Sequence, residues 1–294
     1  MKRKIPVHFF IGLAIIIIAQ ILMFRNVWLI PLYFTPIQWT GYILMMDALI
    51  FKKKGRSMLL NKVGLFILFG VLSIIFWYIF EFYNLYMKNW IYIGMPENLF
   101  MRMLGYFWAF ATIGPGMMFT AEVLELYFFK DIKLKKHKYS TRYKIWTMFF
   151  GLIFITITFF GNFLLKRLFN IEFNLAFWTA PAVWMGFFML LEPVNQFLGA
   201  PNWLTPFENG KPGRFISLII SGVICGFLWE FWNYWTITKW YYDIPYPVMF
   251  KIFEMPILGF FGFIPFALEY YAMYNITLKG ILKQWNYNEN EFWT

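Results

Sequence analysis

The amino-acid sequence predicts an all-α, polytopic integral-membrane protein with about eight transmembrane helices, arranged as two parallel four-helix repeats. Composition is the first reason: of 294 residues, 61% are apolar and 14% are charged, whereas about 25% of a soluble domain is charged. The second reason is the recurrence of apolar runs of the length that crosses a bilayer. The third is a pattern of polar and aromatic residues that occurs twice.

The pattern is an internal duplication with a nearly constant offset. Four residues recur 145 positions later: Pro36, Trp39, Gly41 and Asp47 as Pro181, Trp184, Gly186 and Glu192. A second group recurs 149 or 150 positions later: Phe80, Glu81, Asn84, Trp90 and Tyr92 as Trp229, Glu230, Asn233, Trp240 and Tyr242. The residues that both copies retain are the first candidates for a functional role.

The apolar runs give each copy four predicted spans. The longest lie near 7–24, 63–80, 145–165 and 215–229, and shorter or more polar runs lie near 37–51, 100–129, 178–198 and 250–278. An even number of spans gives both copies the same orientation in the membrane. The predicted organisation is a repeat over 1–130, a basic cytoplasmic connector over 131–144, a repeat over 145–280 and a cytoplasmic tail over 281–294.

The net charge of +11 is explained by its position along the chain. With the N-terminus inside, 19 of the 26 basic residues fall in cytoplasmic segments: 2–4, 52–62, 130–144, 211–214 and 279–283. This positive-inside asymmetry predicts a multi-pass protein of the inner (cytoplasmic) membrane with both termini cytoplasmic. We expect the basic loops to contact anionic lipid headgroups, at about 1 kcal/mol per Lys or Arg, and we expect no nucleic-acid partner.

The scarcity of Cys and His excludes several kinds of site. Cys225 is the single cysteine, and His8 and His137 lie far apart in the sequence. An intramolecular disulfide, a cysteine-based metal site or a Ser-His-Asp triad therefore has no basis. The sequence contains no phosphate loop and no dinucleotide-binding turn, so we predict no cofactor.

Acidic residues inside the predicted spans are the candidate catalytic groups, because charge at membrane depth is costly and usually functional. Glu81 and Asn84 are three residues apart and share a helix face, which lets the amide orient a proton-donating carboxyl. The candidates are Glu81, Glu230, Glu122, Glu269, Asn84 and Asn233.

Structural roles remain open for these residues. The carboxyl–amide pairs can instead hold helices together, and Asp47 and Glu192 can be helix-end carboxylates. Arg102 and Lys251 are positioned to neutralise Glu81 and Glu230.

The fourth span of each copy contains helix breakers. Gly114-Pro115-Gly116 interrupts one, and Pro256, Gly259, Gly262 and Pro265 interrupt the other. Proline removes a backbone donor, and interrupted helices at matching places in two halves indicate a binding site or a packing kink.

Trp229-Glu230, Trp240 with Tyr242, and Pro265 followed by Glu269 resemble the lycopene cyclase domain of heterodimeric and fused carotenoid cyclases, a small helical membrane domain that occurs in pairs. Copy one carries a weaker form in Phe80-Glu81, Trp90 with Tyr92, Pro115 and Glu122. The family usually has Asp where this chain has Glu, and a tandem Glu-Glu after the proline. The resemblance implies that Glu230, Glu269, Glu81 and Glu122 handle protons for a polyene in the bilayer.

Three functions fit these observations. The first is a membrane-embedded enzyme of isoprenoid or other lipid metabolism, a cyclase or isomerase, that works by acid–base chemistry. The second is a small proton- or cation-coupled transporter, and the third is a non-catalytic scaffold. The expected partner is a membrane lipid or isoprenoid substrate, and a homo-oligomer is compatible with the sequence.

Overall fold

The computed structural model describes residues 3–245 and 250–281, and this part of the chain is mainly helical with a few short strands. From the N-terminus its elements are α1 (Val7–Phe24), α2 (Ile30–Lys54), α3 (Met58–Asn61), α4 (Val63–Met87), β1 (Trp90–Ile93), α5 (Leu99–Leu124) and a π-helical turn η1 (Glu125–Phe129). They continue as α6 (Thr141–Phe169), η2 (Leu175–Trp178), α7 (Ala180–Phe197), α8 (Leu204–Glu208), α9 (Gly213–Trp235), β2 (Lys239–Tyr242), β3 (Lys251–Ile252), β4 (Met255–Pro256), η3 (Ile257–Gly262) and α10 (Phe263–Ile281).

Within the described residues, six helices are long and apolar enough to cross a membrane: α1, α4, α5 with η1, α6, α9, and η3 with α10. The predicted first span, 7–24, coincides with α1. The runs near 37–51 and 178–198 fall in α2 and α7, which are not among the six. These two helices lie inside the bundle, α2 against α1 and α5, and α7 against α6 and α10. The predicted tail lies, apart from Ile281, outside the described residues.

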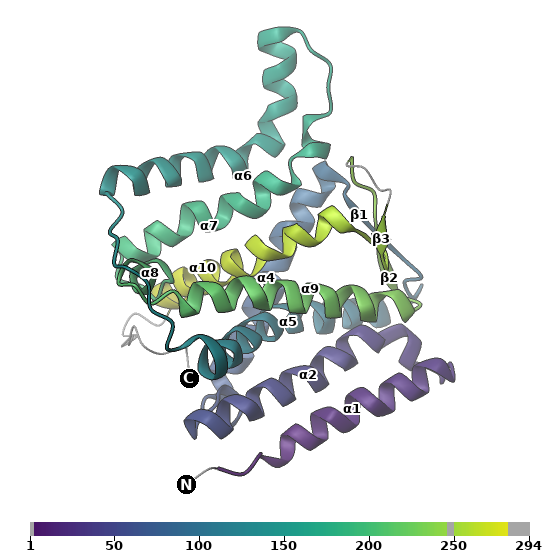
Figure 1. Cartoon of the computed structure of the whole chain (residues 1–294). Coiled ribbons are helices and arrows are strands. Elements are labelled where there is room, and N and C mark those ends of the chain that lie inside the picture. The colour runs from purple at the N-terminus through teal and green to yellow at the C-terminus, as the bar shows by residue number, and fades with distance from the viewer. Residues whose placement is uncertain (1–2, 246–249, 282–294) are drawn as a thin grey trace.

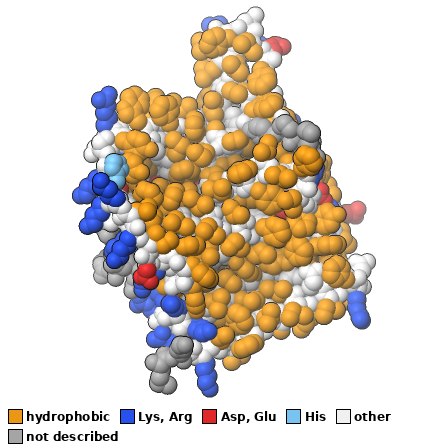
Figure 2. All heavy atoms as spheres, viewed as in Figure 1, with side chains coloured by type: hydrophobic (Ala, Val, Ile, Leu, Met, Phe, Trp, Pro, Cys, Tyr) orange, Lys and Arg blue, Asp and Glu red, His pale blue; other side chains and the backbone are white. Residues whose placement is uncertain are grey.

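The helices run side by side, so the bundle has two distinct ends (Figure 1). The strands gather at one end, which we call the strand end, and α8 marks the other. Lys52, Lys53 and Lys54 terminate α2 at the α8 end, and Figure 2 shows Lys and Arg side chains gathered there beside a wide apolar surface. We call it the basic end.

Close helix contacts depend on glycine in both halves. A Cβ on Gly41 would lie 2.7 Å from the carbonyl oxygen of Gly12, and a Cβ on Gly151 would lie 2.9 Å from that of Gly186. Small residues of this kind let two membrane helices approach along their backbones. The contact is α1 against α2 in one case and α6 against α7 in the other.

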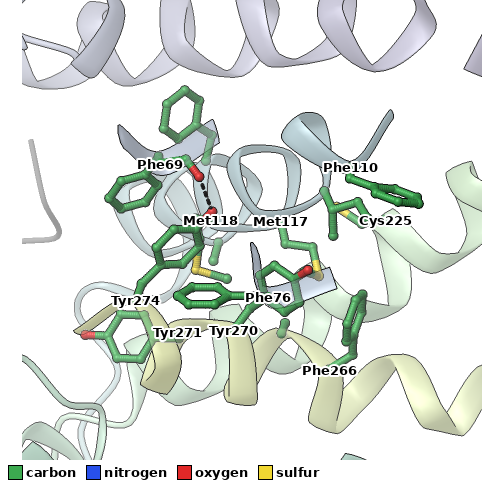
Figure 3. Close-up of a cluster of buried hydrophobic side chains, with 14 of the residues drawn as sticks. Phe69, Phe76, Phe110, Met117, Met118, Cys225, Phe266, Tyr270, Tyr271 and Tyr274 are labelled. Atoms are coloured by element: carbon green, nitrogen blue, oxygen red, sulfur yellow. Dashed lines mark hydrogen bonds between the residues drawn. The ribbon is translucent and has the colours of Figure 1, made fainter. Parts of the chain in front are cut away.

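The centre of the bundle is an aromatic core (Figure 3). Tyr274 stacks on Phe69 with ring centroids 4.2 Å apart, and its hydroxyl donates to the Phe69 carbonyl at 2.8 Å. α5 remains helical through Pro115, while Ser73 of α4 accepts from Gly114 N at 2.9 Å and donates to Phe110 O at 2.5 Å. The hydroxyl therefore bridges two backbone groups of α5 beside its proline, so a neighbouring helix supports α5 where the sequence predicted an interruption.

Asp47 and Glu192 hold the short helices of the basic end. Asp47 accepts from Ser57 Oγ at 2.7 Å and from Leu59 N at 3.1 Å, at the start of α3. Glu192 accepts from the backbone nitrogens of Trp203 and Leu204, at the start of α8. Carboxylates are favourable at this position because the first N–H groups of a helix lack intrahelical partners.

His8 adds a contact that the sequence pattern did not indicate. Its Nε2 lies 3.2 Å from Asp47 Oδ2, so α1 is joined to the same carboxylate that holds α3.

The charge of the basic connector predicted a segment surrounded by solvent, but the structure shows it docked against α8 and the residues that follow. Leu134 N donates to Gly210 O at 2.9 Å, and His137 N donates to Glu208 O at 3.0 Å. Glu208 also accepts from Tyr139 N at 2.9 Å and pairs with Lys144 at 2.8 Å. Glu208 at the end of α8 and Gly210 after it supply the acceptors, which composition alone does not reveal.

Candidate functional site

The two halves of the chain meet in a short antiparallel ladder at the strand end. Trp90 of β1 pairs with Tyr242 of β2, and Tyr92 pairs with Trp240. These are the duplicated aromatic positions of the sequence, and in the ladder the Trp of each copy lies opposite the Tyr of the other copy. An isolated two-stranded ribbon is marginal in water, so this ladder depends on the helices beneath it.

An asparagine below each strand holds the ladder in place. Asn84 Nδ2 donates to Trp90 O at 2.8 Å, and its Oδ1 accepts from the backbone nitrogens of Asn89 and Trp90. Asn233 Nδ2 donates to Trp240 O at 2.8 Å, and its Oδ1 accepts from Trp240 N at 3.0 Å. The expectation that these amides orient the neighbouring carboxyls is therefore wrong: both side chains bind strand backbone.

Glu81 is bound by three neutral donors. Its Oε1 accepts from Tyr92 OH at 2.5 Å, from Trp77 Nε1 at 2.7 Å and from Trp90 Nε1 at 3.1 Å. Several donors on one carboxyl oxygen fix its position and satisfy it. Among the described residues, the predicted ion pair of Glu81 with Arg102 is not formed, and aromatic N–H and O–H groups bind the carboxyl instead.

Glu230 has the same kind of partners but fewer of them. Its Oε1 accepts from Tyr242 OH at 2.7 Å and more distantly from Trp240 Nε1 at 3.4 Å. In copy two the position equivalent to Trp77, 149 residues later, is Gly226. Glycine has no side chain, so Glu230 lacks the donor that Trp77 provides to Glu81. Glu230 is fully buried, and its Oε2 has no hydrogen-bond partner among the described residues.

The Tyr242 hydroxyl stays protonated and donates to Glu230. Burial, together with the nearby Glu230, raises the pKa of Tyr242 well above its ordinary value. Its hydroxyl therefore keeps its proton and can donate to Glu230, while Trp240 Nε1 donates to the Tyr242 oxygen at 2.7 Å. The expected partner Lys251 is exposed on β3.

A cavity of about 450 Å³ lies at the strand end between the two halves, within the size range of small-molecule sites. Both duplicated prolines, Pro36 and Pro181, line it, as do the four duplicated aromatic residues of the ladder. Glu230 is the one of the six candidate catalytic residues that contributes to this lining. Its walls are otherwise dominated by apolar and aromatic side chains.

Aromatic rings surround the inner part of this cavity. Phe266 has ring neighbours on several helices, with centroids 5.4 Å from Trp184, 5.8 Å from Trp77 and 6.0 Å from Trp229. Trp90 lies 6.2 Å from Trp184 across the same space. Such ring faces carry partial negative charge and attract cations by about 0.5–2 kcal/mol each.

Part of the cavity rim is exposed apolar surface. Leu258 and Phe261 of η3 are 53% and 64% exposed, and Met185 of α7 is 39% exposed. All three line the cavity. A rim of this composition suits access from lipid.

The remaining predicted acids lie away from the cavity lining. Glu122 is buried in α5 and pairs with Lys54 of α2 at 2.9 Å. Glu269 is fully buried in α10, and neither of its oxygens has a partner among the described residues. It lies three residues after Phe266, one turn beyond the cavity wall. The six candidates therefore do not share one site.

Two cavity residues were missed as site residues by sequence reasoning. Trp77 was not among the candidate site residues, although it lines the cavity and donates to the Glu81 carboxyl. Arg102 was expected to form an ion pair, yet it lines the cavity. For Trp77 the asymmetry of the repeat was the available indication, because the position 149 residues later is Gly226, whereas Arg102 has a cationic counterpart in Lys251.

Within the described residues, no group of three or more His, Cys, Asp or Glu side chains is placed to hold a metal ion. Comparison of the chain with protein-family models, with curated proteins and with solved structures finds no match.

Proposed function

We propose that this chain is an integral-membrane enzyme that carries out acid–base chemistry on an isoprenoid-type lipid, with Glu230 as the proton-transferring residue. One observation supports this most strongly. Glu230 lines an aromatic cavity with an apolar rim, and its Oε2 has no partner among the described residues. Buried polar atoms are normally hydrogen-bonded, so an unpartnered oxygen on a residue of the cavity wall suggests a group that acts on a ligand.

The proposed chemistry conserves all atoms of the substrate. Glu230 Oε2 delivers a proton to one carbon of an alkene, so that a C–H bond forms, the π bond breaks and a carbocation remains. Attack by a second alkene on the cation forms a ring, and loss of a proton from an adjacent carbon returns that proton to the carboxylate. The sum is a cyclisation, or an isomerisation where no ring forms. Trp184, Trp229 and Phe266 are placed to stabilise the cation.

The resemblance to the lycopene cyclase domain supports this proposal from the sequence. Glu230 occupies the acidic position that follows an aromatic residue, and Trp240 and Tyr242 follow at the family's spacing. In the structure these two aromatics are the groups that hydrogen-bond Glu230. Glu81, with three donors on one oxygen, fits a structural role in the first copy.

The same proposal includes an arrangement in the membrane. Eight spans are obtained when α2 and α7 are added to the six long apolar helices. We place the two halves as parallel repeats in the inner (cytoplasmic) membrane, with the basic end and both termini cytoplasmic. The lysines of that end then meet anionic lipid headgroups, and the strand end faces the opposite side.

The decisive experiment compares Glu230→Gln with Glu81→Gln and with Glu172→Gln, whose side chain is 78% exposed. Each purified variant is incubated with lycopene or geranylgeranyl diphosphate in D₂O, and isomeric products and deuterium incorporation are measured by mass spectrometry. We expect the wild type and Glu172→Gln to incorporate deuterium and Glu230→Gln to lose at least 100-fold in rate, as general acid–base catalysis contributes about 10²–10⁴-fold.

Thermal unfolding in detergent checks that Glu230→Gln remains folded. The proposal is wrong if the wild type converts neither probe and cellular lipid profiles do not depend on Glu230. A Glu230-dependent proton flux in proteoliposomes, without any lipid product, would instead establish a carrier.

A further inference from the structure

We propose that the cavity binds a phosphorylated lipid, with its phosphate at Arg102 and its hydrocarbon chain along α5 toward the middle of the bundle. This inference names the substrate class of the proposed enzyme and rests on that function in placing the substrate in this cavity.

One face of α5 forms a long wall of the cavity. Its lining residues follow helical spacing: Met101, Arg102, Gly105, Tyr106, Ala109, Phe110 and Ile113. At 1.5 Å per residue, the wall from 101 to 113 is about 18 Å long. The part of the wall further along α5 is apolar and aromatic, whereas its start, in the first turn of α5, holds the guanidinium of Arg102. A wall with one charged end suits an amphiphile with one charged end.

Arg102 is the one Lys or Arg among the described residues that line the cavity. It is partly buried and forms no ion pair with another described residue, whereas Lys239 at the same end is paired with Glu254. Glu97, the nearest acid in sequence, is exposed. Arginine presents a planar fork of donors that binds phosphate oxygens in pairs.

The start of α5 adds to the attraction. The N-terminus of a long helix carries partial positive charge and favours anions. Here the Asn98 cap accepts from Met101 N at 3.1 Å, and Arg102 follows in the same turn. Tyr106 lies one turn further along the lining face.

Glu230 supplies the independent indication that a ligand belongs here. It is fully buried, lines the same cavity, and retains an unpartnered oxygen among the described residues. Glu230 lies five residues before the end of α9, or about 7–8 Å into the bundle at 1.5 Å per residue. A chain held by its phosphate at the first turn of α5 therefore reaches Glu230 with its hydrocarbon part.

The test measures binding by quenching of tryptophan fluorescence in phosphatidylcholine nanodiscs, since several tryptophans line the cavity. The probes are geranylgeranyl diphosphate, geranylgeraniol and inorganic pyrophosphate. The variants are Arg102→Gln, Arg102→Lys and the control Arg25→Gln, at the exposed end of α1. We expect wild type and Arg25→Gln to bind the diphosphate at least tenfold more tightly than the alcohol, and pyrophosphate alone to bind far more weakly. Arg102→Gln should abolish this preference and Arg102→Lys should keep part of it.

Equal affinity for the diphosphate and the alcohol in the wild type, or an unchanged preference in Arg102→Gln, overturns the inference. Tight binding of pyrophosphate alone does so as well, because the site would then recognise free phosphate rather than a lipid. Glu230→Gln separates the two proposals. If Glu230→Gln loses conversion and Arg102 has no effect on binding, the proposed enzyme stands and the phosphorylated substrate is wrong. If binding depends on Arg102 but no conversion occurs, the phosphorylated ligand stands and the proposed enzyme is wrong.

Discussion

Trp90 and Tyr242 are paired across an antiparallel ladder, and each donates a hydrogen bond to a different buried or partly buried glutamate. Trp90 donates to Glu81, which lies in the same half of the chain, and Tyr242 donates to Glu230 in the other half. The ladder therefore positions both carboxyls at once. A shift of either strand relative to the helices would move the donors to Glu81 and to Glu230 together.

The asparagines that seat the strands should be needed for stability. We expect Asn233→Ala and Asn84→Ala each to lower the free energy of unfolding by about 1–3 kcal/mol, because each leaves backbone groups of Trp240 or Trp90 without their partner. Thermal unfolding in detergent measures the effect. Asn174→Ala is the control, because Asn174 is exposed. If Asn84→Ala and Asn233→Ala both unfold at the same temperature as Asn174→Ala, the ladder does not depend on these asparagines.

Gly114 should tolerate no side chain. A Cβ at this position would overlap the Tyr274 hydroxyl, which is held by its bond to Phe69 O. We expect Gly114→Ala to destabilise the protein by about 1–3 kcal/mol, the usual cost of overpacking.

Gly64→Ala is the matched control, because a Cβ on Gly64 meets nothing within 4 Å. Replacing glycine by alanine inside a helix is otherwise stabilising by about 0.5–1 kcal/mol. Melting temperatures of the two variants should therefore shift in opposite directions, and a shared direction would contradict the packing seen around Tyr274.

The docking of the connector should weaken in acid through Glu208. Burial alone would raise the pKa of this carboxyl, but hydrogen bonds from Lys144, Gln196 and Tyr139 N outweigh it and lower the pKa below its ordinary value. A lowered folded-state pKa stabilises the fold above the unfolded-state pKa of about 4.3, and this contribution disappears as the pH falls through the folded-state value.

We therefore expect wild-type stability to fall below about pH 4.3 and Glu208→Gln to lose part of that dependence. Unfolding temperatures from pH 7 to pH 3 in detergent, with Glu172→Gln as the exposed control, check the sign. An identical pH profile for Glu208→Gln and the wild type would exclude this contribution.

The sequence by itself determined the helical class, the first span and the residues that recur in each half. Apolar runs and residue identity need no tertiary information, because the cost of exposing polar backbone in lipid acts on each segment separately. The duplication also named in advance Trp90, Tyr92, Trp240 and Tyr242, which form the ladder.

Only the tertiary structure decided what each acid does. Glu122 meets Lys54, and Glu81 meets three donors, whereas Glu230 and Glu269 keep oxygens without partners among the described residues. The equivalent of Lys54, 145 residues on, is Gly199, and that of Trp77, 149 residues on, is Gly226. The effect of these differences on each acid depends on how the helices rotate and pack. Spacing along one helix determines which residues share a face, but not which neighbouring helix that face contacts.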